Sequence, residues 1–145
     1  MNALYVLFKV AEAEYVLPAA DVLHMDSYSG ATHVPGAPAY VAGLMQSRRR
    51  VIPVVDLRLR FGLATAPPTL DSRVVVVQTG ERAVGLLADS AREVRHMAPD
   101  DFHPPPELIA EQCSGYVTKV AQAGARLLML IDFHKVIGEE VPVGK

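Results

Sequence analysis

The residues best suited to metal binding or nucleophilic catalysis in this chain of 145 residues are five histidines and one cysteine. No two of the histidines have the HxH, HxxxH or HExxH spacing that brings two imidazoles to one metal ion; they are His24, His33, His96, His103 and His134. The single thiol, Cys113, cannot form a thiolate cluster, and its neighbours form no recognisable nucleophile motif. The sequence therefore predicts neither a metal ion nor a covalent catalytic centre.

Three aspartates, Asp56, Asp89 and Asp132, each follow a strand-like apolar segment. Two such carboxylates could work as a general acid and base if the fold brought them together. A carboxylate at the end of a strand can also accept hydrogen bonds from the next turn or helix, and this capping role needs no second carboxylate nearby. Because the sequence also lacks a glycine-rich phosphate loop and a GxSxG motif, we predict that the chain is not an enzyme.

Positive charge is concentrated between residues 48 and 60, where five arginines accompany one aspartate and give a local charge of +4 in a chain of net charge −2. Small barrels bind single-stranded nucleic acid through basic grooves with interleaved aromatic residues. No aromatic residue lies within Arg48–Arg50, and Arg58 and Arg60 are two residues apart, so on a helix they point to different sides. A nucleic-acid-binding barrel that uses Arg48–Arg50 therefore stays as the alternative to a hairpin tip that faces solvent or a protein partner.

The composition is that of one globular domain covering residues 1–145, with 50% hydrophobic residues. The longest apolar runs, 51–55, 74–77 and 127–131, have the length of strands and are far short of the roughly 20 residues that span a bilayer. The first residues lack the pattern of a signal peptide, and a lone cysteine suits a reducing compartment. These features predict a cytoplasmic protein.

The chain contains an internal repeat: residues 40–62 align without gaps on residues 116–138. The identical pairs are Tyr40/Tyr116, Val41/Val117, Gln46/Gln122, Arg50/Arg126, Asp56/Asp132 and Gly62/Gly138. Upstream, VLHM at 22–25 matches VRHM at 94–97. We infer two similar halves, about 3–70 and 71–138.

Each half is predicted to consist mainly of short antiparallel strands, which is typical of small barrels. Residues 4–10 with 15–17, and 73–79 with 83–87, have the pattern of hairpins. Short helices are expected at 57–61 and 133–137, because each follows a capping aspartate and ends before a glycine. A third helix is expected to begin in PPPELIAEQ at 104–112.

Several segments together resemble the CheW-like domain family over residues 4–138. They are VPGAPAYVAGL at 34–44, RRRVIPVVDLRLRFGL at 48–63, VGLLADSAREV at 84–94 and RLLMLIDFHKVI at 126–137. The resemblance implies a mainly β fold of two SH3-like five-stranded barrel subdomains that share a core, with a few short helices. Subdomain 1 would cover about 15–70 and subdomain 2 about 71–138, with the N-terminal strand and the C-terminal segment exchanged between them.

The resemblance also implies a non-catalytic adaptor without a cofactor. Such proteins couple the cytoplasmic tips of methyl-accepting chemoreceptors to the regulatory domain of a CheA-type histidine kinase, in receptor arrays at the inner face of the membrane. The family's partner-facing surface corresponds here to Val22, His24, Gly43 and Arg48. Arg49, which only the first half of the repeat carries, is added as a candidate for partner binding.

The hairpin departs from the family's usual pattern at Gln46, Ser47 and Arg49, and His24 stands where an acidic residue is common. Since the turn glycine is replaced by Arg49, we expect the tip to avoid positive φ. These departures leave open whether the chain serves flagellar, pilus or another pathway.

Overall fold

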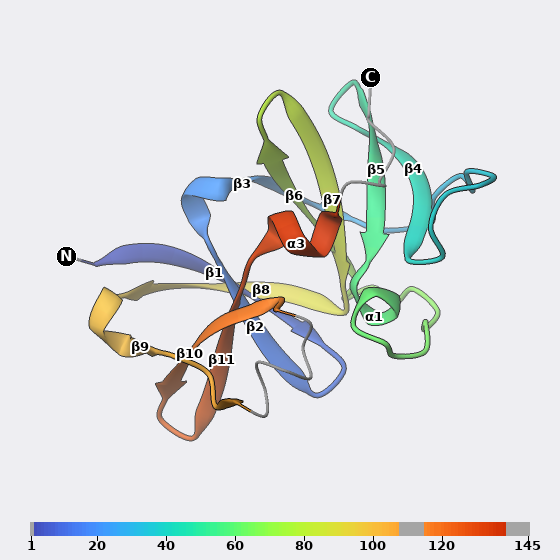
Figure 1. Ribbon diagram of the computed structural model, residues 1–145. Helices are drawn as coiled ribbons and strands as arrows, with labels where there is room; N and C mark the ends of the chain where they lie inside the picture. The colour runs from blue at the N-terminus through green and yellow to red at the C-terminus, as the bar shows by residue number, and fades with distance from the viewer. Residues whose placement is uncertain (1, 108–114, 139–145) are drawn as a thin grey trace.

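The computed structural model describes residues 2–107 and 115–138 and contains two β-sheets with very little helix (Figure 1). The strands are β1 (Ala3–Val10), β2 (Ala13–Pro18), β3 (Val22–Ser27), β4 (Val41–Ser47), β5 (Arg50–Asp56), β6 (Arg73–Thr79), β7 (Arg82–Ala88), β8 (Ser90–Met97), β9 (Phe102–His103), β10 (Val117–Ala123) and β11 (Arg126–Ile131). The α-helices are α1 (Leu57–Arg60) and α3 (Phe133–Ile137), and 3-10 turns occupy Ala19–Asp21 and Pro99–Asp101.

The two sheets have the same topology. One sheet has the strand order β3-β6-β7-β5-β4, and the other has the order β8-β1-β2-β11-β10-β9. Each contains one parallel pair at the corresponding place, β5 with β7 and β11 with β2, while the remaining pairs are antiparallel. The repeat in the sequence thus produces two barrels built on one plan, and the mainly β fold with two SH3-like subdomains is confirmed.

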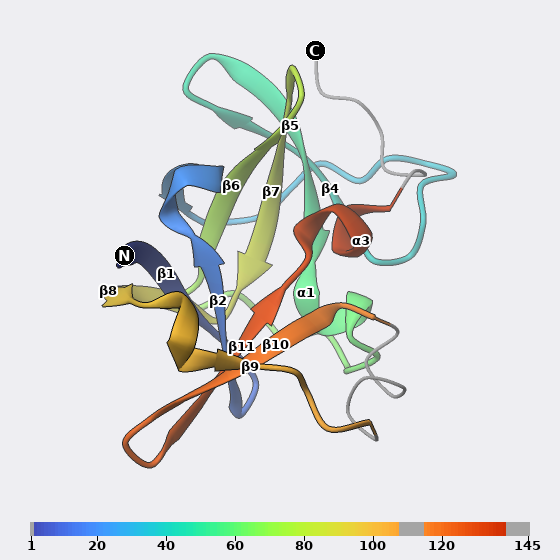
Figure 2. The same ribbon diagram turned by 60° about the vertical axis from the view of Figure 1, so that its left-hand side comes forward.

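The sheets do not follow the two halves of the sequence. The hairpin β1–β2 pairs with β8 and β11 of the second half, while the hairpin β6–β7 pairs with β3 and β5 of the first. In Figure 2 the blue strands β1 and β2 accordingly lie beside β8 and β11, away from β4 and β5. Each half therefore contributes its first hairpin to the other barrel.

A shared core joins the barrels. Its buried residues come from both sheets and both helices, and among them are Phe8 and Leu17 from one sheet, Val75 and Leu86 from the other, and Phe133 from α3. Each barrel also has its own smaller interior cluster, centred on Val16 and Leu128 in one and on Ile52 and Val74 in the other. Because β6 alternates between Val74 and Val76 on one face and Val75 and Val77 on the other, one strand serves two cores and has no polar face in this stretch.

The two helices end the long strands in the predicted manner. The Asp56 side chain accepts a hydrogen bond from the backbone of Arg58 at 3.0 Å, and Asp132 accepts one from His134 at 3.0 Å. The equivalence extends to the backbone, where the N–H groups of these aspartates donate to the carbonyls of Tyr40 and Tyr116, both at 2.8 Å. Helices at 57–61 and 133–137 are therefore confirmed to within a residue. Residues 108–112 of the helix predicted at 104–112 lie outside the described residues.

Gly43 lies where the loop before β4 crosses that strand. Thr32 and Leu44 exchange two backbone hydrogen bonds of 2.8 Å, which is the counterpart of the β9–β10 pairing in the other barrel. Gly43 has φ +144°, and a Cβ atom there would lie 2.1 Å from the Thr32 carbonyl oxygen. The absence of a side chain lets the loop close onto the strand.

Replacement of Gly43 by alanine should therefore lower the free energy of unfolding by about 3 kcal/mol more than the same change at Gly30. Gly30 has a comparable φ of +129° but open space around the added methyl group, so it controls for backbone strain alone. Urea unfolding of the two variants measures the difference. Equal losses would mean that the contact with Thr32 relaxes at no cost.

Candidate protein-docking surface

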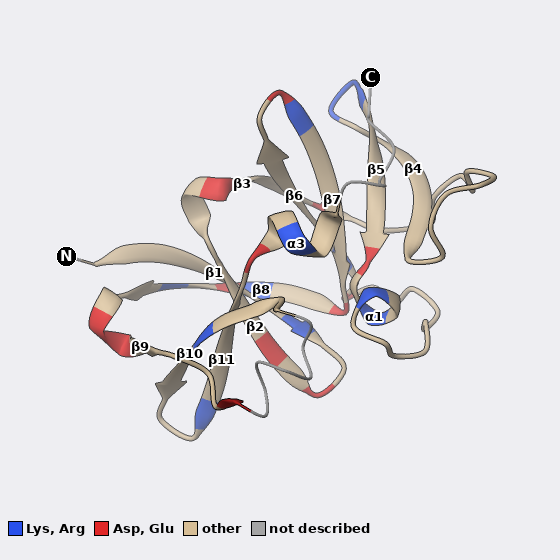
Figure 3. Cartoon of the chain, in the orientation of Figure 1, with Lys and Arg blue, Asp and Glu red and all other residues tan. Residues whose placement is uncertain are grey.

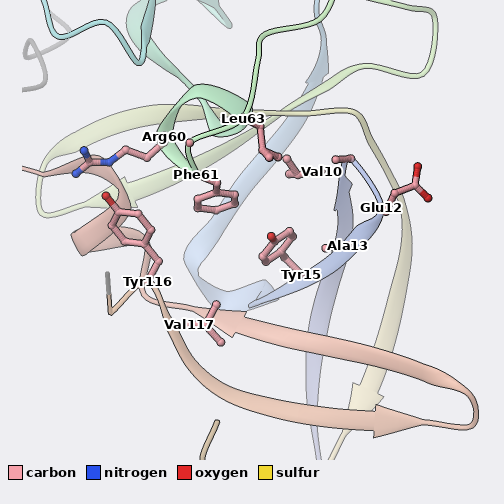
Figure 4. Close-up of a pocket in the computed structure, with 11 residues that line it drawn as sticks. Val10, Glu12, Ala13, Tyr15, Arg60, Phe61, Leu63, Tyr116 and Val117 are labelled. Atoms are coloured by element: carbon pink, nitrogen blue, oxygen red, sulfur yellow. The ribbon is translucent and has the colours of Figure 1, made fainter. Parts of the chain in front are cut away.

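A groove of about 740 Å³ opens where the two barrels meet (Figure 4). Three elements surround it: the turn between β1 and β2, the end of α1 with the following residues, and the start of β10. Its wall is mostly apolar and consists of Val10, Ala11, Glu12, Ala13, Tyr15, Arg60, Phe61, Gly62, Leu63, Tyr116 and Val117. Since both sequence halves contribute to it, the groove exists only in the assembled pair of barrels.

The floor of the groove is a row of aromatic rings that begins in the core. Phe8 stacks on Tyr15 with ring centroids 5.8 Å apart, Tyr15 contacts Phe61 at 5.1 Å, and Phe61 contacts Tyr116 at 5.8 Å. Such contacts stabilise a packed arrangement beyond simple area burial. The apolar surface that faces the groove is thus held rigidly by the protein beneath it.

Arg60 connects α1 to α3 at one end of the groove. Its Nε donates to the carbonyl of Val136 at 2.7 Å and its Nη2 to that of Lys135 at 3.1 Å. The guanidinium carbon lies 4.0 Å from the ring centroid of Tyr40 and 5.1 Å from that of Tyr116. Arg60 therefore combines hydrogen bonds to a helix C-terminus with cation–π contacts, and it bridges the repeated tyrosines of the two halves.

Arg58 fixes the rim of the groove from the other side of α1. It forms a bidentate pair with Asp89, with Nε–Oδ1 at 2.9 Å and Nη2–Oδ2 at 2.7 Å, and Oδ2 also accepts the N–H of Ala11 at 2.7 Å. The hydrogen bonds from Arg58 hold the pKa of Asp89 below its ordinary value, with a further lowering by the Ala11 bond, although burial acts in the opposite direction. The turn between β1 and β2 is thereby tied to α1.

The arginines of residues 48–60 do not form one basic stripe (Figure 3). Arg58 and Arg60 point to different partners, as their spacing predicts. Arg50 donates to the carbonyl of Glu81 at 3.2 Å in the exchanged hairpin. Its repeat counterpart Arg126 likewise reaches the other exchanged hairpin through Glu14, at 2.6 and 2.9 Å. Three of the five arginines thus hold the fold together.

His24 lies on β3 with its side chain turned into the seam between β3 and β4, the two outer strands of their sheet. Its Nε2 lies 2.7 Å from the hydroxyl oxygen of Ser47. Ser47 is buried, with 4% of the residue exposed, and its hydroxyl donates a hydrogen bond to the carboxylate of Asp26. Because the single hydroxyl hydrogen goes to Asp26, the His24 Nε2 must donate to Ser47. These three side chains close the barrel where no strand pairing does, and Ser47 is not arranged as a nucleophile activated by histidine.

The partner-binding residues predicted from the sequence are divided by the structure into covered and exposed groups. Val22 packs half-buried against the shared core, His24 has 15% of its side chain exposed, and Gly43 is covered by Thr32. Arg48 and Arg49 are exposed, and within the described residues neither guanidinium makes a hydrogen bond or ion pair. Of these five residues, Arg48 and Arg49 are thus the most exposed.

The tip formed by Arg48 and Arg49 corrects one expectation. Both residues have positive φ, +49° and +71°, although neither is glycine. The register joins Ser47 to Arg50 and leaves two residues for the turn, and two-residue turns that match strand twist require left-handed backbone. Strand pairing thus overrides the preference of the side chains, and the tip presents two exposed arginines on a strained backbone.

A second depression, of about 750 Å³, lies beside this hairpin. It is lined by Ser27, Ser29, Gly30, Ala31, Thr32, Leu44, Met45, Gln46 and Val51. No aromatic residue is among them, so bases would find no stacking platform next to the exposed arginines. The alternative of a nucleic-acid-binding barrel gains no support from this geometry.

In the part of the chain that the structure describes, the three aspartates considered as candidate acids and bases make structural contacts. No group of three potential metal ligands occurs there. Asp56 and Asp132 cap their helices. Asp56 and Asp89 line one small pocket, but Arg58 lies between them, donating its backbone N–H to Asp56 and its guanidinium to Asp89. Cys113 lies outside the described residues. Across residues 2–107 and 115–138, no helix is long and apolar enough to cross a membrane.

Sequence reasoning missed the residues that form the groove. Tyr15, Phe61 and Tyr116 come from distant segments, and each alone is an aromatic residue in a hydrophobic string. The sequence does mark one residue of the groove, because Tyr116 is repeated as Tyr40. In the structure both tyrosine rings contact Arg60. Two barrels with one plan, joined at an open aromatic groove, define a small β protein equipped to hold another protein.

The chain belongs to the CheW-like domain family, whose sequence model matches residues 4–141. It is 29% identical over 135 residues to the chemotaxis protein CheW of Rhizobium meliloti (strain 1021), covering 93% of this chain and 87% of that protein. It is 30% identical over 136 residues to protein FrzA of Myxococcus xanthus, covering 90% and 82%. The crystal structure of the scaffolding protein TtCheW from Thermoanaerobacter tengcongensis superimposes with a TM-score of 0.88 at 27% identity, over 99% of both chains.

The ion pair at the groove rim predicts a pH dependence of stability. Because the pKa of Asp89 is lowered in the folded state, the unfolded chain binds more protons between the two pKa values, and stability rises with pH there. The contribution should be complete above the ordinary carboxyl pKa of about 4 and should disappear as the pH falls through the folded value.

Asp89→Asn removes the charge and keeps an oxygen for the Ala11 N–H, but its NH2 group replaces one of the two oxygens that accept from Arg58. The part of the stability difference that changes with pH therefore reports the charge. We expect wild type to be more stable than the variant at pH 7, with the difference shrinking below about pH 4. Urea midpoints across pH give the comparison. A difference that stays constant with pH would show that the charge of Asp89 contributes nothing.

Proposed function

We propose that the chain is a non-catalytic adaptor that couples chemoreceptors to a CheA-type histidine kinase in bacterial chemotaxis or a related chemosensory pathway. The observation that carries the proposal is the rigid aromatic groove between the barrels, an exposed apolar surface that a second protein can cover. Membership of the CheW-like domain family supports the same role, since proteins of that family named CheW serve chemotaxis and TtCheW is described as a scaffolding protein.

The groove is proposed as the site for the receptor tip. Its walls offer few polar groups, so a partner with unpaired backbone amides would lose hydrogen bonds on entering it. A helix satisfies its own backbone and presents side chains, which is the usual way in which apolar grooves recognise peptides. A helical segment at the receptor tip meets this requirement.

Arg48 and Arg49 are proposed as part of the contact with the kinase regulatory domain. Their exposure, their lack of intramolecular partners among the described residues and their strained backbone favour an intermolecular task. Val22, His24 and Gly43 would then act indirectly, since they hold β3, β4 and the loop in the positions that present the tip. The adaptor would work in the cytoplasm, in receptor arrays at the inner face of the membrane.

Leu63→Glu tests the groove. Leu63 is 41% exposed and lines the groove, so the charge should weaken binding of a receptor cytoplasmic fragment by roughly tenfold or more, with the melting temperature nearly unchanged. Leu70→Glu, at a residue 95% exposed and outside the groove, is the matched control. Binding by fluorescence anisotropy that is unaffected by Leu63→Glu would exclude the groove as the receptor site.

Arg48→Glu tests the tip. The substitution reverses a charge and leaves a non-glycine residue at the same positive φ, so stability should change little. We expect weaker capture of the kinase regulatory domain from the same genome and unchanged binding of the receptor fragment. A large drop in melting temperature would instead make Arg48 structural, and undiminished capture would remove the tip from the kinase contact.

A further inference from the structure

The two ends of the groove carry opposite charges. In Figure 4, Arg60 lies on one side of the aromatic floor, next to Tyr116, and Glu12 lies on the other side, in the turn between β1 and β2. Phe61, Leu63 and Tyr15 lie between them. An occupant of the groove therefore meets a cation at one end, an apolar surface in the middle and an anion at the other end.

Neither charge is cancelled by an ion pair within the described residues. Arg60 uses two of its five N–H groups on the neutral carbonyls of Val136 and Lys135, which leaves donors for an incoming carboxylate. Glu12 is exposed and interacts with the charge of Arg58 without contacting it. Arg58 itself is bound to both carboxylate oxygens of Asp89. Both ends thus keep their charge for an occupant.

We propose that this polarity selects an amphipathic helix with an acidic side chain at one end of its apolar stripe and a basic one at the other. It also fixes the direction in which that helix docks, with the acidic end at Arg60 and the basic end at Glu12. This inference rests on the proposed helix site and adds to it the charge pattern of the partner. Complementary charges discriminate between partners chiefly because the mismatched arrangement places like charges together.

Two helical peptides with the same apolar residues at i, i+3, i+4 and i+7 serve as probes. The mixed peptide has glutamate at one end of the stripe and lysine at the other, and the acidic peptide has glutamate at both ends. Wild-type protein should bind the mixed peptide roughly fivefold more tightly in fluorescence anisotropy at low salt. Glu12→Lys should reverse this preference, because both ends of the groove then carry positive charge.

Glu81→Lys is the matched control. Glu81 is exposed in the turn between β6 and β7, the counterpart of the turn that carries Glu12, and the change in net charge is identical. That variant should keep the preference of wild type. A spin label on the acidic end of the mixed peptide should broaden the amide signals of the residues around Arg60 more than those of residues 11–13.

Equal affinity of wild type for the two peptides, no binding of either, or the same reversal in Glu81→Lys would overturn the inference. These outcomes are separable from failure of the proposed function. Capture of receptor and kinase fragments without discrimination between the peptides would remove the polarity rule and leave the adaptor in place. Clear discrimination between the two peptides without capture of the receptor and kinase fragments would keep the polarity rule and remove the adaptor function.

Discussion

The exchange of the first hairpin between the two halves is the constraint on which the rest of the structure depends. Each barrel obtains two of its strands from the other half of the sequence. Backbone hydrogen bonds hold these strands in place. Neither half has a complete sheet of its own, so the shared core and the two interior clusters must form together. Units of about 70 residues are marginal alone, and the exchange turns two such units into one larger cooperative body.

The polar residues of this protein work mainly at places that strand pairing leaves open. His24, Ser47 and Asp26 close a seam between outer strands, and in the other barrel Arg126 on β11 links Glu14 on β2 to Glu93 on the outer strand β8. Within the described residues no buried side-chain polar atom lacks a partner. Closed seams matter for an adaptor, since an open strand edge would invite unspecific pairing.

The groove follows from the same architecture. The groove opens where the two barrels that share a core meet. The row of aromatic rings from Phe8 to Tyr116 makes its floor rigid and apolar. Arg60 belongs to the fold through its hydrogen bonds to α3 and to the groove through its position on the wall. The stability of the fold and the shape of the groove therefore depend on one set of contacts.

The sequence by itself determined the strands, the hairpins and both short helices, because these depend on local patterns: apolar alternation, turn residues, and an aspartate before each helix with a glycine after it. Through the repeat it also determined that there are two similar units. Only the tertiary structure decided which half completes which barrel, that His24 contacts Ser47, and that Arg48 and Arg49 adopt left-handed backbone. It also placed Tyr15, Phe61 and Tyr116 side by side. The physical reason is that pairing between distant strands sets register and proximity, and no pattern within a short segment encodes either.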